Sequence, residues 1–101
     1  MGAHVIVWEF RAREGLDRDF VRAYAADGDW ARLFGRSQGF LGTTLLRDRE
    51  VPRRYLTIDR WVSREAFEEF RRLNAADYQR LDRRLATLTE EERRVGVFEE
   101  P

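Results

Sequence analysis

The stretch from Gly39 to Ser63 constrains the fold more than any other part of the chain. It contains two runs rich in Thr, Leu, Ile, Tyr and Trp, Phe40 to Leu46 and Tyr55 to Val62, joined by a charged loop that includes Pro52. Residues of these types favour strands, and turn-forming residues between two such runs predict an antiparallel hairpin. The fold is therefore expected to be organised around a β-hairpin near the middle of the sequence.

One face of the second run combines aromatic and polar residues. Successive side chains of a strand alternate, so one face holds Tyr55, Thr57, Asp59 and Trp61 and the other holds Leu56, Ile58, Arg60 and Val62. An unpaired carboxylate is costly to bury, so a face made only for packing rarely places an Asp between a Thr and a Trp. Two interpretations are open for Asp59: it belongs to a functional site, or it has a structural role as a cap or as the partner of an arginine such as Arg60 or Arg54.

A strand, a helix and a short helical turn are predicted before the hairpin. The segment from His4 to Arg13 alternates as a strand does, with Ile6, Trp8, Phe10 and Ala12 on one face. Apolar residues at helical spacing then predict a helix from Leu16 to Ala25. Asp29 is placed to cap a short turn whose apolar side is Trp30, Leu33 and Phe34, closed by Gly35. This turn either covers the core or forms a mobile flap over a cavity entrance.

A helical region follows the hairpin. Ser63 is a good N-cap, and apolar residues from Ala66 to Leu88 recur at steps of three to five. This spacing predicts one long helix, or two helices with a bend near residues 74–77. The opposite side is charged and is expected to face solvent; it carries Arg64, Glu68, Glu69, Arg71, Arg72, Arg80, Arg83 and Arg84.

The last strand is predicted from Arg93 to Glu99, after a final turn capped by Thr89 and Glu92. The order β-α-β-β-α-β is typical of a ferredoxin-like α+β fold, a four-stranded antiparallel sheet with helices on one face. Residues 1–101 are expected to form one domain. The uncovered face, which carries Leu41 and Leu45 or Val95 and Val97 according to the register, stays apolar and predicts a face-to-face homodimer.

Composition excludes several classes of function. Nineteen arginines balance nineteen acidic residues, so the net charge of zero gives no electrostatic basis for binding nucleic acid or a membrane. The absence of Cys and Lys removes thiolate metal sites and lysine Schiff-base chemistry. The single His4 lies at the start of the chain, so no imidazole-centred metal site is expected. With no bilayer-spanning apolar run and no signal peptide, a cytoplasmic location is expected.

The sequence resembles the antibiotic biosynthesis monooxygenase domain family, whose members are small dimeric α+β barrels. The resemblance runs from about Val5 to Phe98. It is carried by the turn Trp30-Leu33-Phe34, by Gly39-Phe40-Leu41-Gly42, by Tyr55, by the pair Asp59-x-Trp61 that ends the third strand, and by Ala66-Phe67 at the opening of the next helix.

The resemblance implies a cofactor-independent oxygenase acting on a phenolic or polycyclic aromatic substrate in an apolar pocket between sheet and helices. Loss of a hydroxyl proton would leave an electron-rich carbanion that passes an electron directly to O₂, so neither cofactor nor metal is expected. Trp61 is predicted to stack on the substrate or donate its indole N–H, and Asp59 to handle or orient a proton. The predicted substrate-binding residues are Tyr55, Trp8, Phe10, Trp30, Phe34, Phe70, Asn74 and Tyr78. The proton acceptor is left open between Asp59, Tyr78 and a water.

The sequence departs from the haem-degrading members of the same family. Those enzymes ligate iron through a His in the helix after the Trp, together with an Asn on the first strand. Here that helix reads Glu69-Phe70-Arg71-Arg72, and Phe10 stands near the Asn position. Haem degradation is therefore not expected. The alternative to an oxygenase is a non-catalytic dimeric protein that binds a small aromatic metabolite without turning it over.

Overall fold

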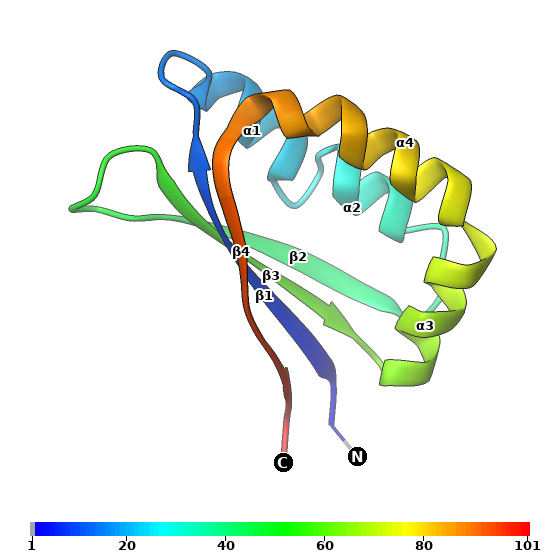
Figure 1. The fold of residues 1–101 in the computed structure, drawn as a ribbon. Helices are drawn as coiled ribbons and strands as arrows, with labels where there is room; N and C mark the ends of the chain where they lie inside the picture. Colours follow the sequence, from blue (N-terminus) through cyan, green and yellow to red (C-terminus); the bar gives the residue numbers. More distant parts are fainter. Residues whose placement is uncertain (1) are drawn as a thin grey trace.

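The computed structural model describes residues 2–101 as a layer of helices packed on a four-stranded antiparallel sheet (Figure 1). The elements are β1 (His4–Ala12), α1 (Asp17–Tyr24), α2 (Asp29–Phe34), β2 (Phe40–Arg47), β3 (Arg54–Trp61), α3 (Arg64–Leu73), α4 (Ala75–Leu85), the 3₁₀ helix η1 (Ala86–Leu88) and β4 (Thr89–Glu99). The strand order is β2-β3-β1-β4, with every neighbouring pair antiparallel. The predicted ferredoxin-like fold is confirmed.

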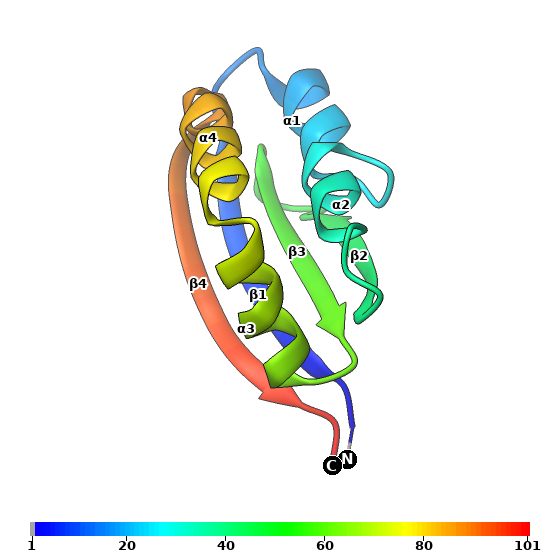
Figure 2. The same cartoon turned by 90° about the vertical axis from the view of Figure 1, so that its right-hand side faces the viewer.

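All of the helices lie on the same face of the sheet. Figure 2 shows α3 and α4 passing in front of β1 and β4, whereas α1 and α2 lie toward the β3 and β2 side. The opposite face carries no helix (Figure 1). The space between the two layers is therefore bounded by side chains from both central strands and from the helices above them.

The predicted hairpin is present, with β2 and β3 each within one residue of the expected bounds. The loop that joins them is held by Asp48, whose Oδ1 accepts the backbone N–H groups of Glu50 (2.8 Å) and Val51 (3.0 Å). Arg53 adopts a positive φ of 65° at its end. An Asp that accepts two backbone donors in this way is a standard means of closing a tight turn.

The alternation of side chains in β3 and β1 agrees with the sequence. Tyr55, Thr57 and Trp61 point toward the helices and are 1%, 4% and 0% exposed, with the half-buried Asp59 in the same row. Ile6, Phe10 and Ala12 of β1 are buried on the same side. The helices α1 and α2 complete this core through a chain of aromatic contacts, among them Phe20 with Tyr55 at 4.7 Å.

Three register shifts break the alternation elsewhere in the sheet. The one at the start of β4 leaves Glu90 as the extra residue, between Glu91 opposite Arg11 and Thr89 opposite Ala12. In β2 the register passes from Phe40 opposite Trp61 to Gly42 opposite Arg60, so that Leu41 is the extra residue. In β4 it passes from Gly96 opposite Val7 to Arg94 opposite Trp8, so that Val95 is the extra residue. A bulge reverses the side-chain pattern beyond it. Thr43 of β2 and the residues Arg94 and Glu92 of β4 consequently face the helices.

The structure corrects two details of the expected chain. No capped turn precedes the last strand, because Thr89 and Glu92 are already paired to β1 opposite Ala12 and Phe10. Asp29 is the first residue of α2 rather than its cap, and Gly28 occupies the N-cap position. Other expectations hold: Ser63 caps α3 by accepting the N–H of Ala66 (3.1 Å), and the helical region divides at Asn74.

The register also decides which apolar residues occupy the uncovered face. Leu45 pairs with Thr57 and Val97 pairs with Ile6, so both lie on the helix side. The apolar residues on the uncovered face are Val5, Val7, Leu46, Leu56, Ile58 and Phe98. Phe98 is 51% exposed there and Leu46 is 45% exposed. An apolar patch is therefore present as expected, but it is built from other residues.

The bulge in β2 depends on Gly42, whose φ is +142°. A side chain at this position would meet open space, so the cost of adding one is backbone strain alone. We expect Gly42→Ala to lower the free energy of unfolding by about 1–3 kcal/mol, measured by urea denaturation. The exposed neighbour Thr44 provides the control, since Thr44→Ala requires no unusual backbone. Equal effects of the two substitutions would contradict this account of the bulge.

Candidate functional site

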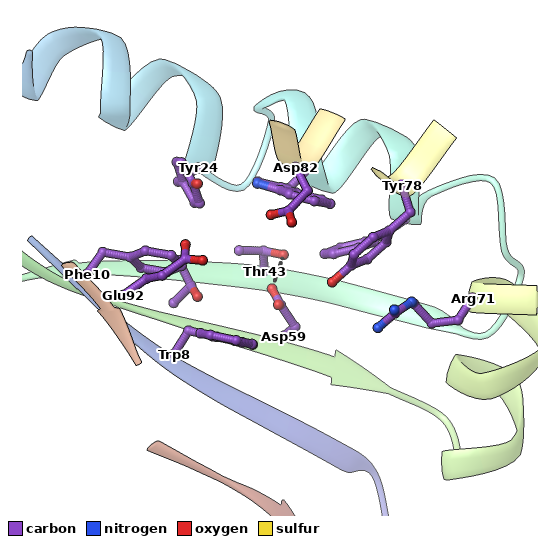
Figure 3. A pocket seen from close by; sticks show the side chains of 12 residues that line it. Trp8, Phe10, Tyr24, Thr43, Asp59, Arg71, Tyr78, Asp82 and Glu92 are labelled. Carbon is purple, nitrogen blue, oxygen red and sulfur yellow. Dashed lines mark hydrogen bonds between the residues drawn. The ribbon is translucent and has the colours of Figure 1, made fainter. Parts of the chain in front are cut away.

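A cavity of about 270 Å³ lies between the sheet and the helices (Figure 3). Every helix except η1, and every strand, contributes to its wall. The lining residues are Trp8, Phe10, Tyr24, Trp30, Phe34, Thr43, Thr57, Asp59, Arg71, Tyr78, Asp82 and Glu92. Small-molecule pockets typically begin at about 300 Å³ and combine apolar walls with a few polar groups. The size and the lining favour a ligand of a few rings.

Aromatic rings form the walls of the cavity. Above the sheet, the ring of Trp30 lies 4.9 Å from that of Tyr78 and 5.6 Å from that of Phe34. On the sheet side, Trp8 and Phe10 of β1 lie stacked at 6.1 Å. Trp30, Phe34 and Phe10 belong to the buried core, so their rings are held by packing on the side away from the cavity. Such walls suit a flat aromatic ligand.

The floor of the cavity is polar and centres on Asp59. The hydroxyl of Thr43 donates a hydrogen bond to Asp59 Oδ1 at 2.7 Å, which links β2 to β3 (Figure 3). Burial raises the pKa of Asp59 to about 6, against a lowering by the Thr43 hydrogen bond. Among residues 2–101, no arginine forms an ion pair with Asp59. This carboxylate is therefore suited to accept a proton near neutral pH.

The expected arginine partners of Asp59 are engaged elsewhere. Arg54 binds Glu9 and Asp48, each at 2.6 Å, and Arg60 binds Glu100 at 2.7 Å. Both arginines stand an odd number of residues from Asp59 in β3, so their side chains lie on the opposite face of the strand. The pairing interpretation is wrong, and the carboxylate is left facing the cavity.

Three other charged residues line the cavity. The guanidinium of Arg71 stacks over the Tyr78 ring at 4.0 Å. Burial raises the pKa of Tyr78, and the positive charge of Arg71 partly opposes that rise. Glu92 lies toward the other end, and Asp82 lies above Asp59 (Figure 3). Burial raises the pKa of Glu92, and the nearby negative charge of Asp82 raises it further.

The structure brings six of the ten predicted site residues into the cavity lining, namely Trp8, Phe10, Trp30, Phe34, Asp59 and Tyr78. Three of these, Trp30, Phe34 and Phe10, also belong to the buried core. The α2 turn therefore covers the core and supplies a cavity wall at once.

Tyr55, Phe70 and Asn74 do not line the cavity. The hydroxyl of Tyr55 donates to Asp17 Oδ2 at 2.7 Å and accepts from Arg47 Nε at 3.5 Å, which ties β3 to α1. Phe70 is 2% exposed and packs edge-on against Phe34. Asn74 closes the end of α3 by donating to the Phe70 carbonyl at 3.1 Å.

Trp61 lies beneath the cavity wall rather than in it. Its indole is 0% exposed and packs against four phenylalanine rings, Phe34, Phe40, Phe67 and Phe70, with centroid separations of 5.1–5.5 Å. Its Nε1 has no hydrogen-bond partner within residues 2–101. The contact with Phe34 connects Trp61 to the cavity through one intervening side chain. A catalytic role for Trp61 stays a prediction.

Sequence reasoning missed six lining residues: Tyr24, Thr43, Thr57, Arg71, Asp82 and Glu92. Thr57 lies on the mixed face of β3, two residues before Asp59. Thr43 and Glu92 face the cavity because of bulges, which the alternating pattern does not reveal. Arg71 was assigned to the solvent face of the helix; it is exposed, yet its guanidinium folds back over Tyr78 and lines the cavity.

Within residues 2–101, no three His, Asp or Glu side chains converge as a set of metal ligands. None of the helices in that part of the chain has the length and apolar character needed to cross a membrane.

The raised pKa of Asp59 predicts a pH-dependent effect of Asp59→Asn. The folded protein binds the proton more tightly than the unfolded chain, so the stability that this group contributes is present below pH 3.8 and is lost as the pH rises through about 6. Asn carries no charge at any pH. We therefore expect Asp59→Asn to gain up to about 3 kcal/mol in unfolding free energy, relative to the wild type, between about pH 4 and pH 8.

Denaturant unfolding across this pH range measures the difference, and an NMR titration of Asp59 measures the pKa directly. Thr43→Val is the matched variant, because removing the donor to the charged carboxylate raises the pKa of Asp59 further. A stability difference that does not change with pH would show that the carboxylate titrates as an exposed one.

Comparisons with known proteins agree with the fold and the sequence pattern. SnoaB, described as a cofactor-independent oxygenase from Streptomyces nogalater, has a structure (a single-residue variant) that matches with a TM-score of 0.80 and 24% identity, covering 99% of this chain and 94% of that one. A putative antibiotic biosynthesis monooxygenase from Bordetella bronchiseptica matches with a TM-score of 0.79 and 22% identity, covering 100% and 99%. A NIPSNAP family protein from Agrobacterium tumefaciens matches with a TM-score of 0.68 and 18% identity, covering 98% and 93%.

At these identities the structural matches establish the fold alone. No curated protein matches the chain. The sequence profile described as antibiotic biosynthesis monooxygenase matches residues 3–81, from the residue before β1 into α4. Since this match includes most of the chain, the protein belongs to the antibiotic biosynthesis monooxygenase family.

Proposed function

We propose that this protein is a cofactor-independent monooxygenase that oxidises a phenolic or polycyclic aromatic substrate in the cavity above Asp59. The observation that carries the proposal is a carboxylate with a pKa of about 6 on the floor of an aromatic-walled cavity. A base with a pKa near the working pH combines a large deprotonated fraction with useful proton affinity. Family membership supports the same chemistry, and SnoaB is described as a cofactor-independent oxygenase.

The reaction begins with transfer of the phenolic proton to Asp59. The carboxylate and the Thr43 hydroxyl lie side by side, so the proton acceptor is held in one orientation (Figure 3). The resulting anion, whose charge is delocalised onto a ring carbon, passes one electron to O₂. The substrate radical and superoxide combine at that carbon to give a peroxide anion, which takes the proton back from Asp59. The peroxide then loses water, with the hydrogen on that carbon, to leave a quinone. One oxygen atom ends in the product and one in water, and the substrate supplies all the electrons.

Other side chains position the substrate for this step. Trp30 and Tyr78 on one side and Trp8 and Phe10 on the other present ring faces to a flat molecule. Tyr78 also carries a hydroxyl that faces the cavity (Figure 3), so it is the second candidate for proton handling. Burial raises the pKa of Tyr78, so this hydroxyl stays protonated near neutral pH and is a poorer proton acceptor than Asp59. Trp61 acts as a positioning residue by supporting Phe34 from below.

Oxygen uptake by the purified protein tests the proposal. With a panel of anthrones and naphthalene hydroquinones, we expect uptake above the buffer rate, and a loss of about a hundredfold or more in Asp59→Asn. Asp27→Asn removes an exposed carboxylate from the loop between α1 and α2 and is the matched control, which should retain the activity. Trp61→Phe should reduce the rate less than Asp59→Asn, because Trp61 touches the wall and not the substrate.

Binding without uptake would favour the alternative, a protein that holds an aromatic metabolite. Quenching of Trp8 and Trp30 fluorescence reports such binding, since both indoles line the cavity. Saturable quenching by the whole panel, with oxygen consumption equal to the buffer rate, would overturn the oxygenase proposal. Uptake that is unchanged in Asp59→Asn would instead overturn the role of Asp59.

We also infer that two copies of the chain associate through the uncovered face of the sheet. Ile58 and Val7 lie at its centre, and Phe98 and Leu46 are among its exposed apolar residues. A contiguous apolar face on a small protein is covered most simply by the same face of a second copy around a two-fold axis.

Sedimentation measures this association. The wild type is expected to have twice the mass of the chain, and Ile58→Glu to shift the protein toward the monomer, because a dimer would bury the new charge twice. Gln79→Glu adds the same charge on an exposed position of α4 and should leave the mass unchanged. A monomeric wild type would refute the inference.

A further inference from the structure

Two arginines at one end of the site lie against cavity space without a carboxylate partner. A second cavity, of about 330 Å³, adjoins the first and shares with it Trp8, Phe34, Asp59, Arg71 and Tyr78. Its lining also includes Arg94 of β4. Because five residues belong to both, the two cavities form one continuous groove between the sheet and α3 and α4.

The charges at this end do not cancel. Three arginines line the second cavity, against the carboxylates of Asp59 and Glu68. Arg64 is paired with Glu68 at 3.1 Å. Within the part of the chain that the structure describes, neither Arg71 nor Arg94 forms an ion pair with a carboxylate. The neighbouring arginines Arg72 and Arg93, by contrast, each lie within 4.0 Å of an acidic residue.

Both free guanidiniums are placed by specific features of the fold. The face of Arg71 lies on the Tyr78 ring at 4.0 Å, and stacking of this kind leaves the N–H groups at the edge of the guanidinium free to donate. Arg94 faces the helices only because the bulge at Val95 reverses the side-chain pattern of β4. Continued alternation from Val97 would have turned Arg93 to this side instead.

The opposite end of the first cavity is acidic. Glu92 lines it there, and Figure 3 shows Arg71 and Glu92 on opposite sides of Asp59, with Asp82 above Asp59 between them. A ligand with one anionic group therefore has a single favoured orientation along the groove. Asp59 belongs to both cavities and lies between the two charged ends.

We propose that Arg71 and Arg94 form an anion subsite that binds the carboxylate of an aromatic hydroxy acid, with its neighbouring hydroxyl directed at Asp59. This inference rests on the proposed function, whose substrate it narrows from phenols in general to phenolic acids. The planar guanidinium fork matches a carboxylate, and two such groups on one anion compensate for the exposure of each alone. The ring then occupies the space between Trp8 and Tyr78.

Calorimetric titration with a matched pair of probes tests the subsite. The probes are a hydroxynaphthoic acid, with its hydroxyl next to the carboxyl, and the corresponding neutral hydroxynaphthamide. We expect the acid to bind the wild type about tenfold more tightly than the amide. Added salt should reduce this preference, because both arginines are exposed to solvent.

Substitutions locate the preference. Arg71→Gln and Arg94→Gln should each remove most of the advantage of the acid over the amide. Arg94 does not line the first cavity, so Arg94→Gln should leave binding of the amide unchanged, whereas Arg71→Gln is judged by the ratio of acid to amide affinity. Arg71→Lys keeps the charge but loses the fork, and it should retain an intermediate preference. Arg83→Gln is the control, because Arg83 is an exposed residue of α4 that lines neither cavity.

The outcomes separate this inference from the proposed function. Equal binding of acid and amide, or a preference that survives in Arg71→Gln and Arg94→Gln, would overturn the anion subsite and leave aromatic binding intact. If neither probe binds, both the anion subsite and the proposal that the cavity binds an aromatic ligand are overturned. An arginine-dependent preference with no oxygen uptake from any phenolic acid would support the subsite and contradict the oxygenase.

Discussion

The hydrogen bond from Thr43 to Asp59 is the interaction on which the site depends. It joins β2 to β3 on the floor of the cavity, and it is the single side-chain hydrogen bond formed by that carboxylate among residues 2–101. A carboxylate buried without any hydrogen-bond donor would stay protonated at pH values well above its usual pKa. A carboxylate paired with an arginine would stay ionised and would be a poor proton acceptor. One neutral donor in a largely apolar setting gives the intermediate case, a pKa of about 6.

The geometry of that floor follows from the bulges at Leu41 and Val95. An uninterrupted β2 would place either Phe40 or Thr43 on the helix side, because positions three apart in a strand face opposite ways. The extra residue Leu41, made possible by the positive φ of Gly42, turns both inward. Phe40 can then pack on Trp61 at 5.1 Å while Thr43 reaches Asp59. The bulge in β4 acts in the same way on the opposite edge of the sheet.

These bulges also explain how much of the protein was predictable from its sequence. The strands, the hairpin, the cap at Ser63 and the inward row that contains Asp59 follow from local pattern, and all are present. The ferredoxin-like topology follows from their order. Thr43, Glu92 and Arg94 were not found, because each lies beyond a bulge that shifts the pattern by one residue. No regular period in the sequence marks an extra residue.

Long side chains were a second source of error. Arg71 lies on a face of α3 that is charged and exposed, so pattern alone assigns it to solvent. Its length lets the guanidinium fold back onto Tyr78, which belongs to the next helix. Tyr55 and Trp61 show the converse error, since both face inward as expected but lie under other side chains. The alternation of a strand predicts which face a side chain points to, but it does not predict whether other side chains cover it.

The use of arginine alone for basic residues has a consistent structural consequence. Arg54 binds Glu9 through Nε and Asp48 through a terminal nitrogen, and Arg71 places its flat face on a ring. An ammonium group can do neither with the same geometry. Most arginines outside the cavity lie within 4.0 Å of a carboxylate. Arg71 and Arg94 depart from this pattern within one groove, and the second cavity gives their donors space for a carboxylate that the chain does not supply.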